Sequence, residues 1–409
     1  MLTPSRLPGW NLPSPQRGAA HHPDAAAPAA AASYPAQHGH RRRLLCFLID
    51  TVGQEANHRH VAYRCLAERI AQLMQMEFVG DRELAGTQPG RSVYVVPHDS
   101  IERDTADRWR VHQRHHLFGG VVPHAFVASK AIVHPRISAD AAVPAGWNDA
   151  FAEQVRPVVL EGFTAFDRES LAVAARRLLQ TGPVRLKEAL GSGGRSQYVV
   201  PDHAALREQL DRLDADTLRR GVLVEPQLQS CSTLSVGQVH LAGVRMSYCG
   251  IQHNLTLPCG TSAYAGSELF CVRGGMDVLQ EARLPHRARL AVTQAWHFHR
   301  SAQRHFPGLL ISRANYDVIV GTTVDGAPRS GVLEQSWRIG GASGAEIEAV
   351  RLLAEDPRRT RVAVRTVECY DDSPPPPGAW MTYRRGSAAA DPTEPQLKYV
   401  QVMDDVIGW

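Results

Sequence analysis

The sequence predicts a mixed fold in which a small α/β domain precedes a larger unit of strands and helices. A strand-sized apolar run, LLCFLID at 44–50, is followed by apolar residues at helical spacing over 55–76. A second strand pattern at 92–97 completes a strand–helix–strand order, which is typical of a mainly parallel sheet. Farther along, the pairs Ala242-Gly243 and Asp325-Gly326 indicate turns between strands.

The elements of the larger unit follow from residue patterns that start near Val155. Asp167 is predicted to cap a helix over 168–180, because its side chain can accept hydrogen bonds from the first backbone amides, and Gly182 ends that helix. The other predicted helices are 202–213, about 285–306 and 345–354. The predicted strands are 158–166, 184–190, 196–200, 221–225, 233–241, 244–253, 311–320 and 331–338. After the stiff segment Pro374–Pro377, MTYRR and LKYVQV are predicted to be two short returning strands.

Composition and charge indicate a soluble globular protein. The 409 residues suggest about two or three domains, and a hydrophobic content of 44% excludes global disorder. No apolar run approaches the ~18–20 residues of a membrane span. Lys+Arg 45 against Asp+Glu 41 leaves a net charge of only +4, so we expect neither a nucleic-acid nor a membrane partner. Scattered cysteines without a C-x-x-C pair, and no secretory signal, predict a cytoplasmic protein.

The chain is expected to divide into four segments. Its start is rich in Ala, Pro, His and Ser and has almost nothing with which to build a core. The predicted segments are a disordered leader (1–40), an N-terminal α/β domain (41–140), a main domain (141–356) and a C-terminal extension (357–409) around the proline-rich segment.

The first feature that carries chemistry is VRLKEALGSGGRSQYVV, in which Lys187 on a strand precedes a glycine loop at 191–194. Glycines let backbone N–H groups close over anionic oxygens, and lysine supplies a point charge. The spacing is not that of a P-loop, and most such glycine stretches are ordinary hairpin turns.

The second feature is VLVEPQL, Val222–Leu228, an apolar strand that ends in an acid and continues extended. Such a segment can form a hinge whose backbone groups read the edge of a purine between apolar neighbours. The commoner alternative is a buried strand with an exposed acid at its end.

The third feature is a pair of carboxylates, Asp317 and Glu334, on two strands joined by a turn. Antiparallel pairing is expected to bring them to one face at similar height, and paired carboxylates together with phosphates are how Mg²⁺ is usually held. Arg338 follows Glu334 by four residues, so alternation places it on the same face, where a guanidinium can neutralise a phosphoryl group. The alternative is a cross-strand ion pair at a sheet surface.

Together these features resemble the ATP-grasp superfamily over about residues 120–350, and more closely an uncharacterised bacterial group within it. The resemblance implies an ATP-grasp fold of two α+β subdomains, at about 150–225 and 226–356, preceded by a small α/β domain. The residues that it places on ATP are Lys130, Lys187, Gly191, Ser192, Gly193, Gly194, Glu225, Pro226, Gln227 and Leu228. Those that it places on Mg²⁺ are Asp317, Glu334 and Ser336, the last in a position that is usually asparagine.

The resemblance also implies a reaction. A carboxylate attacks the γ-phosphate of ATP, and an amine then displaces phosphate from the acyl-phosphate, which makes the protein an ATP-dependent carboxylate–amine ligase. Its partners would be ATP and an unknown carboxylate or amine, a small molecule or a peptide. Ser336 favours the alternative of a nucleotide-binding regulator or scaffold without turnover.

Two further regions have open interpretations. The polar stretch 253–268 is interpreted mainly as a surface loop, after which Arg273 is a candidate to orient a substrate carboxylate. The cysteines at 231, 249, 259 and 271 are interpreted as small buried hydrophobic residues, because they lack regular ligand spacing. A metal or redox protein built on histidines and cysteines is the weakest alternative.

Overall fold

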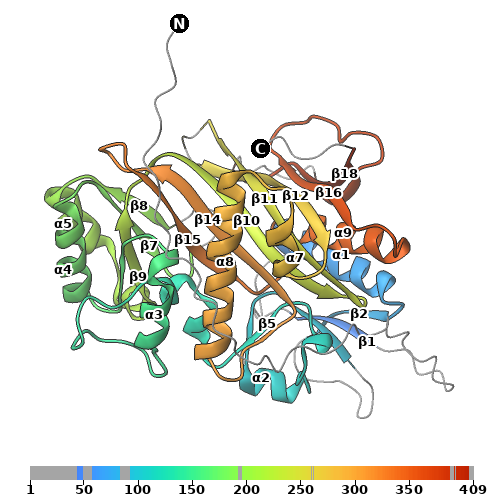
Figure 1. Ribbon diagram of the computed structural model, residues 1–409, viewed down its shortest axis with the longest axis horizontal. Coiled ribbons are helices and arrows are strands. Elements are labelled where there is room, and N and C mark those ends of the chain that lie inside the picture. The colour runs from blue at the N-terminus through green and yellow to red at the C-terminus, as the bar shows by residue number, and fades with distance from the viewer. Residues whose placement is uncertain are drawn as a thin grey trace, which may run out of the picture. The chain divides into compact units, whose positions relative to one another are not determined.

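The computed structural model (Figure 1) describes residues 44–48, 58–82, 93–191, 196–258, 260, 262–386, 391 and 393–404. All of them belong to one unit, His40–Trp409. The predicted leader lies outside the described residues, as do Ser192, Gly193 and Gly194 of the predicted glycine loop.

The described chain contains both strands and helices. The strands are β1 (Leu44–Leu48), β2 (Glu77–Arg82), β3 (Val93–Pro97), β4 (Ile101–Glu102), β5 (Gly120–Val122), β6 (Phe163–Ala165), β7 (Val184–Glu188), β8 (Gln197–Val200), β9 (Val222–Pro226), β10 (Gln229–Leu241), β11 (Val244–Thr256), β12 (Ser262–Arg273), β13 (Leu310–Ile311), β14 (Arg313–Thr322), β15 (Pro328–Ser336), β16 (Arg361–Cys369), β17 (Trp380–Arg384) and β18 (Leu397–Met403). The α-helices are α1 (His58–Leu73), α2 (Arg103–Arg108), α3 (Asp149–Val155), α4 (Arg168–Leu179), α5 (His203–Arg212), α6 (Ala215–Arg220), α7 (Met276–Glu281), α8 (His286–His305) and α9 (Ser343–Glu355).

Three sheets account for the predicted fold class. The first is a parallel sheet of order β2-β1-β3, which confirms the parallel pairing expected near the N-terminus. The second, β6-β9-β7-β8, is covered by α4 and α5, and Asp167 caps α4 by accepting a hydrogen bond from Ser170 N at 2.8 Å. The third is antiparallel and has eight strands in the order β15-β14-β10-β11-β12-β16-β18-β17. The described residues also form a short sheet of order β13-β5-β4.

The two faces of the eight-stranded sheet differ in chemistry because side chains alternate along each strand. On β14, Ala314, Tyr316 and Val318 are fully buried in the core beneath α8, which contacts β10, β14 and β15 (Figure 1). Asn315 and Asp317 take the opposite face, which carries a cavity. Apolar packing against α8 therefore fixes which polar groups of β14 line the cavity.

A β-bulge adjusts the pairing of β14 with β15. Val318 lies opposite Val332 but Asp317 lies opposite Glu334, so that Leu333 is an extra residue in β15. Bulges re-aim side chains beside functional sites. Without this one, Leu333 would stand opposite Asp317 and Glu334 would point to the other face. The predicted juxtaposition of Asp317 and Glu334 is confirmed, and the bulge is its cause.

The interpretation of 253–268 as a surface loop is wrong. Most of it belongs to β11 and β12, and β12 runs through the middle of the eight-stranded sheet. Tyr264 and Ser267 on β12 face the polar cavity, so the first half of the strand lacks the apolar pattern by which it would be identified. Strands β16 and β18, after residue 357, continue the same sheet beyond β12, whereas the four-segment domain division remains a prediction.

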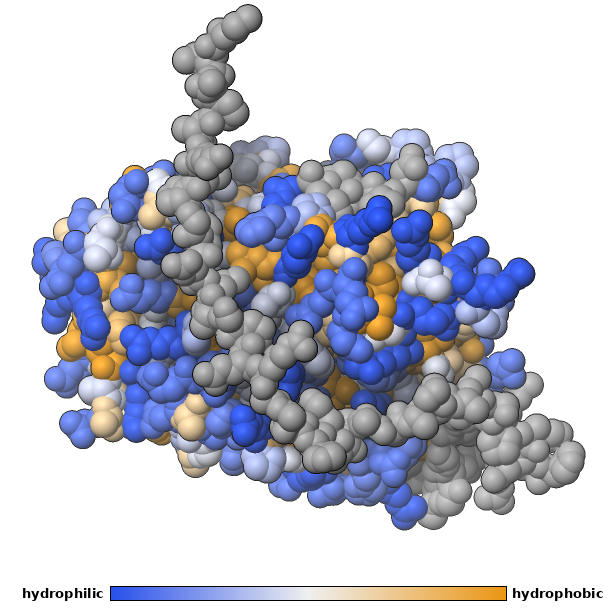
Figure 2. Space-filling model, viewed as in Figure 1, coloured by the Kyte–Doolittle hydropathy of each residue, from blue (hydrophilic) through white to orange (hydrophobic). Residues whose placement is uncertain are grey.

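The face seen in Figure 2 is mostly hydrophilic, with apolar side chains visible between polar ones. No helix in the described part of the chain has the length and apolar character needed to cross a membrane.

Arg313 on β14 and Glu346 on α9 form an ion pair with side-chain exposures of 1% and 0% and an Nη2–Oε1 distance of 2.7 Å. Glu346→Leu should lower the free energy of unfolding by about 3–5 kcal/mol, because Arg313 becomes an unpaired buried charge. The double variant Arg313→Met with Glu346→Leu should lose less free energy of unfolding than Glu346→Leu alone. Urea unfolding followed by tryptophan fluorescence measures both. Asp211→Ala, which breaks the exposed Arg168–Asp211 pair, is the control and should cost under about 1 kcal/mol. A double variant as unstable as the single one would contradict this account.

His299 on α8 predicts a loss of stability in acid. Burial, with smaller repulsion from Arg245 and Arg114, lowers the pKa of His299 to about 4, and its Nδ1 lies 2.7 Å from Tyr316 Oη. Between about pH 6.5, the ordinary pKa of histidine, and pH 4 the unfolded chain takes up a proton that the folded protein does not. This imidazole should therefore remove about 3 kcal/mol of stability over that range. His299→Gln should flatten the pH dependence by that amount in urea unfolding, and the exposed His203→Gln should not.

Candidate functional site

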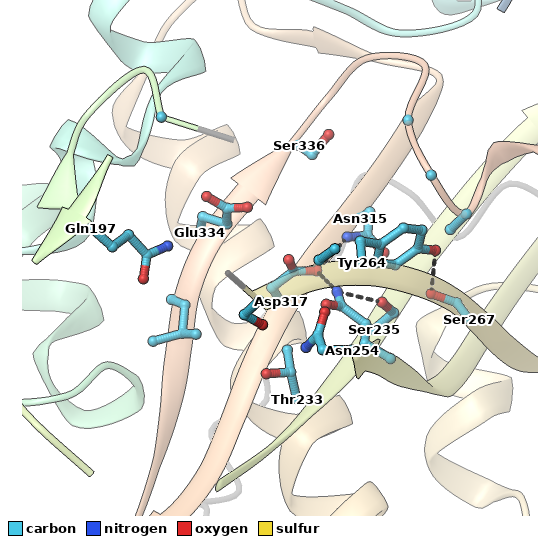
Figure 3. Close-up of a pocket in the computed structure, with 18 of the residues that line it drawn as sticks. Gln197, Thr233, Ser235, Asn254, Tyr264, Ser267, Asn315, Asp317, Glu334 and Ser336 are labelled. Carbon is cyan, nitrogen blue, oxygen red and sulfur yellow. Dashed lines mark hydrogen bonds between the residues drawn. The ribbon is translucent and has the colours of Figure 1, made fainter. Parts of the chain in front are cut away.

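A cavity of about 500 Å³ is lined by residues of the four-stranded sheet and of the eight-stranded sheet. Glu334 and Asp317 point into it from neighbouring strands, and Gln197 on β8 faces them from the other sheet (Figure 3). The structure brings most of the sequence-predicted site residues together in this cavity. Those that line it are Lys130, Lys187, Gly191, Glu225, Pro226, Gln227, Leu228, Asp317, Glu334, Ser336 and Arg338.

Lys187 on β7, Glu225 on β9 and His134, which follows the 3₁₀-helix Lys130–Val133, form a buried triad of charged and ionisable groups. Lys187 Nζ forms an ion pair with Glu225 Oε1, and both side chains are at most 4% exposed. Glu225 Oε2 also lies 3.2 Å from Nε2 of buried His134. Burial alone would raise the pKa of Glu225, but the charge of Lys187 and the contact with His134 outweigh it and lower the pKa to about 2. Glu225 is thus a fixed anion that holds Lys187 in place.

Lys130 connects the glycine loop to the carboxylate pair. It lies in a short 3₁₀-helix, Lys130–Val133, and its side chain is 7% exposed. Its Nζ donates to the carbonyl oxygen of Gly191 and lies 2.8 Å from Glu334 Oε2. One ammonium group therefore contacts both the beginning of the predicted phosphate loop and a predicted metal ligand.

Asp317 is held by two amides. Gln252 Nε2 donates to Asp317 Oδ1 at 2.5 Å, and Asn315 Nδ2 donates to the same oxygen at 2.8 Å. Burial and repulsion from Glu334 raise the pKa of Asp317 to about 6, despite these hydrogen bonds. Glu334 is partly exposed, at 27%, and although desolvation opposes the shift, the neighbouring Lys130 keeps its pKa below the usual range. Two carboxylates in such proximity form a site of concentrated negative charge.

Ser336 lies at the end of β15, directly opposite Asn315. Arg313 Nη1 donates to Ser336 Oγ at 3.2 Å and to Ser336 O at 3.0 Å. The hydroxyl predicted to bind a metal thus accepts a hydrogen bond from a cation.

The predicted hinge is extended as expected, but two of its backbone groups are already used. Gln227 N donates to Pro183 O at 2.9 Å, and the Gln227 side chain donates to Leu228 O at 2.6 Å. Leu228 N–H donates to no group within the described residues. Fewer backbone groups remain for a ligand than the sequence suggests.

The two predicted catalytic arginines have different surroundings. Arg338 lines the cavity, and its Nε lies 3.8 Å from Asp99 Oδ1. Arg273 does not line it, so the prediction that it orients a substrate is wrong. Its guanidinium donates to the carbonyl oxygens of Leu353, Asp356 and Arg359, at and beyond the C-terminal end of α9. A cation is favourable there because the last carbonyls of a helix lack partners.

Several residues that line the cavity were not predicted from the sequence. Arg185 on β7 bonds to Gln227 Oε1 at 2.9 Å and to Gln197 Oε1 at 3.2 Å. Its position two residues before Lys187 puts both on one face of a strand, a signal that could have identified it. Gln252 and Asn315 gave no comparable signal, because single amides on strands are not distinctive.

The cavity continues past the carboxylates over β12, β16 and β18. Lys398 Nζ lies 2.7 Å from Glu368 Oε1 in its wall, and Tyr264 Oη lies 2.7 Å from Ser267 Oγ. Gly341 leaves room for Tyr264, since a Cβ there would come within 2.7 Å of the ring. This far end offers hydroxyls and an ion pair to a second ligand.

The cysteines are only partly as expected. Cys249 and Cys271 are buried, as predicted, but Cys231 is exposed and lines the cavity at the start of β10. Cys259 lies outside the described residues. Among the residues that the structure describes, no three His, Cys, Asp or Glu side chains are grouped so that they could hold a metal ion.

Comparison with solved structures identifies the fold. The biotin carboxylase of Campylobacter jejuni in its β,γ-ATP complex superimposes with a TM-score of 0.50 at 12% identity, over 89% of this chain and 88% of that one. The N5-carboxyaminoimidazole synthetase of Staphylococcus aureus, complexed with ADP, gives a TM-score of 0.50 at 10% identity, over 89% and 94%. Both are ATP-grasp enzymes, and the fold of this chain is the ATP-grasp fold expected from the sequence.

Sequence comparison is less specific about activity. No curated protein matches the chain. A family model described as "Protein of unknown function (DUF3182)" matches residues 47–399, and the chain therefore belongs to the DUF3182 family.

Proposed function

We propose that this protein is an ATP-dependent ligase that joins a carboxylate to an amine through an acyl-phosphate. The observation that carries the proposal is that Lys130 and Lys187 line the same cavity as the carboxylates Asp317 and Glu334. Buried cations beside paired carboxylates suit a triphosphate with a divalent metal, because both kinds of charge then have partners. The ligase-like fold is consistent with this chemistry.

In this proposal the nucleotide lies between the two sheets. Leu228 N–H is the hinge donor left for the purine edge, and Lys187 and Lys130 contact the phosphates with the glycine loop 191–194. Ser192, Gly193 and Gly194 are kept as part of that loop on the sequence alone. Most of the site then lies in the proposed ATP-grasp domain, 141–356, and Lys130 comes from the preceding segment.

The donor set suits Mg²⁺. Asp317 and Glu334 supply hard carboxylate oxygens. The pKa of Asp317 is raised first by desolvation and second by repulsion from Glu334, and a bound cation would offset that repulsion. Mg²⁺, when bound, would neutralise phosphate charge. The side-chain amides of Gln252 and Asn315 donate hydrogen bonds to Asp317 and keep its carboxylate in a fixed orientation.

The reaction asks little covalent chemistry of the chain. A substrate carboxylate oxygen bonds to the γ-phosphorus while the bond to the β-phosphate oxygen breaks, which yields ADP and an acyl-phosphate. The amine then bonds to the acyl carbon, phosphate leaves, and the amine proton passes to solvent. Lys130, Lys187 and Arg338 hold the charges in position, which is how phosphoryl transfer is usually promoted. The acceptor substrate is assigned to the far end, near Tyr264 and Lys398.

A nucleotide-binding protein without turnover is the second candidate. The observation that favours it is Ser336, which stands where ATP-grasp enzymes usually have asparagine and whose hydroxyl accepts a hydrogen bond from Arg313. Release of ADP and phosphate separates the two. A ligase should release both only when pools of carboxylates and amines are supplied, and Glu334→Gln should abolish the release. Thermal stabilisation by ATP with no release under any pool would support the second candidate.

Nucleotide affinity should depend on Lys187. Lys187→Ala alone would leave the Glu225 carboxylate buried without its lysine partner. The test is therefore the double variant Lys187→Gln with Glu225→Gln, which leaves two neutral hydrogen-bonding groups. Loss of a charge-assisted bond should weaken ATP binding by about 10–100-fold. Isothermal titration calorimetry measures the affinity, and Arg168→Gln on the exposed surface of α4 is the control. Unchanged ATP affinity in the double variant would contradict the proposal that the nucleotide binds in this cavity.

Cys231 provides a direct probe of occupancy. Its exposed thiol lines the cavity beside the hinge, and desolvation raises its pKa, so alkylation should be slow at neutral pH and practical at higher pH. Bound ATP should protect Cys231 from iodoacetamide severalfold, as measured by peptide mass spectrometry. Cys65, which is half-buried and does not line the cavity, is the internal control. Equal labelling of Cys231 with and without saturating ATP would contradict the proposed position of the nucleotide.

A further inference from the structure

The carboxylate pair offers very few oxygens to a metal ion. Asp317 Oδ1 accepts hydrogen bonds from both Gln252 and Asn315, so that its lone pairs are occupied. Asp317 Oδ2 accepts none from any described residue. A carboxylate held in this way presents a single oxygen.

Glu334 is limited in the same way. Its Oε2 lies 2.8 Å from Lys130 Nζ, and its Oε1 accepts no hydrogen bond in the described part of the chain. To bridge two cations, Glu334 would have to release an ammonium group that also contacts Gly191. It too presents a single oxygen.

Ser336, the third predicted metal ligand, already accepts a hydrogen bond from an arginine. Arg313 Nη1 donates to Ser336 Oγ at 3.2 Å, while Nε and Nη2 of Arg313 bond to Glu346 at 2.7–3.1 Å. The Arg313 side chain is 1% exposed and cannot move aside without leaving Glu346 unpaired in the interior. A second metal ion at Ser336 would lie against a fixed positive charge.

Asn315 does not replace the missing ligand. It stands opposite Ser336, but its Nδ2 donates to Asp317 and its Oδ1 lies 2.9 Å from Tyr248 Oη. Its carboxamide oxygen is therefore directed to a buried hydroxyl. Two metal ions about 3.5–4 Å apart are readily bridged by a carboxylate with both oxygens free, and neither Asp317 nor Glu334 has both free.

We infer that the site, on the function proposed above, takes one divalent cation, bound by Asp317 Oδ2 and Glu334 Oε1, and that Ser336 is not a ligand. Two protein oxygens completed by phosphate oxygens and water match the usual coordination of a single Mg²⁺. Arg313 is a positioning residue that supplies a permanent positive charge beside Ser336.

Manganese binding tests this inference without reliance on turnover. Mn²⁺ is titrated into the full chain saturated with adenylyl imidodiphosphate, and free Mn²⁺ is counted by electron paramagnetic resonance. One Mn²⁺ per chain is expected. Ser336→Ala should change the Mn²⁺ dissociation constant by no more than about twofold, whereas Glu334→Gln should raise it at least about tenfold. Circular dichroism melting of each variant verifies that it is folded, and Ser336→Thr, which keeps the hydroxyl, is the matched control.

The results that would overturn the inference are distinct from those that would overturn the function. Two Mn²⁺ per chain with the analogue bound, or a loss of about tenfold or more in Ser336→Ala with binding kept in Ser336→Thr, refutes the single-cation site alone. Failure of the analogue to bind, measured separately by calorimetry, refutes the proposed function together with this inference.

Discussion

A buried charge needs a partner of opposite sign, and the cavity of this protein is organised by that requirement. Lys130, Lys187 and Arg313 each have side chains at most 7% exposed, and each is neutralised by one glutamate. Isolated, any of them would cost several kcal/mol. Each pair also joins separate elements: a 3₁₀-helix and β15, β7 and β9, or β14 and α9. Stability of the cavity walls and availability of charge to a ligand therefore depend on the same contacts.

The three pairs differ in how much they leave for a ligand. Lys187–Glu225 and Lys130–Glu334 line the cavity, and their charges can be shared with bound groups. Arg313 makes hydrogen bonds through Nε, Nη1 and Nη2, which makes it part of the framework. The site thus combines cations that can respond to a ligand with one that cannot. This distinction follows from hydrogen bonds and would be invisible in a count of charges.

Much of the fold could be predicted from residue patterns. The apolar periodicity of α8, the cap at Asp167 and the turn at Ala242-Gly243 depend on nearby residues only. Local chemistry of this kind is recorded in short stretches of sequence. The first half of β12 could not be found in this way, since it lines a polar cavity and loses the apolar alternation by which strands are identified.

For the candidate site, the sequence by itself determined the residue types: lysines at 130 and 187, an acid at the hinge, and two carboxylates on adjacent strands. Only the tertiary structure decided which atoms can act. The bulge at Leu333 turns Glu334 toward Asp317. Arg273 bonds to carbonyl groups at the C-terminal end of α9 and not to the cavity, and Arg313 donates a hydrogen bond to the Ser336 hydroxyl. Each outcome depends on a partner at least 15 residues away. Pairing across such separations is set by packing, which residue spacing does not encode.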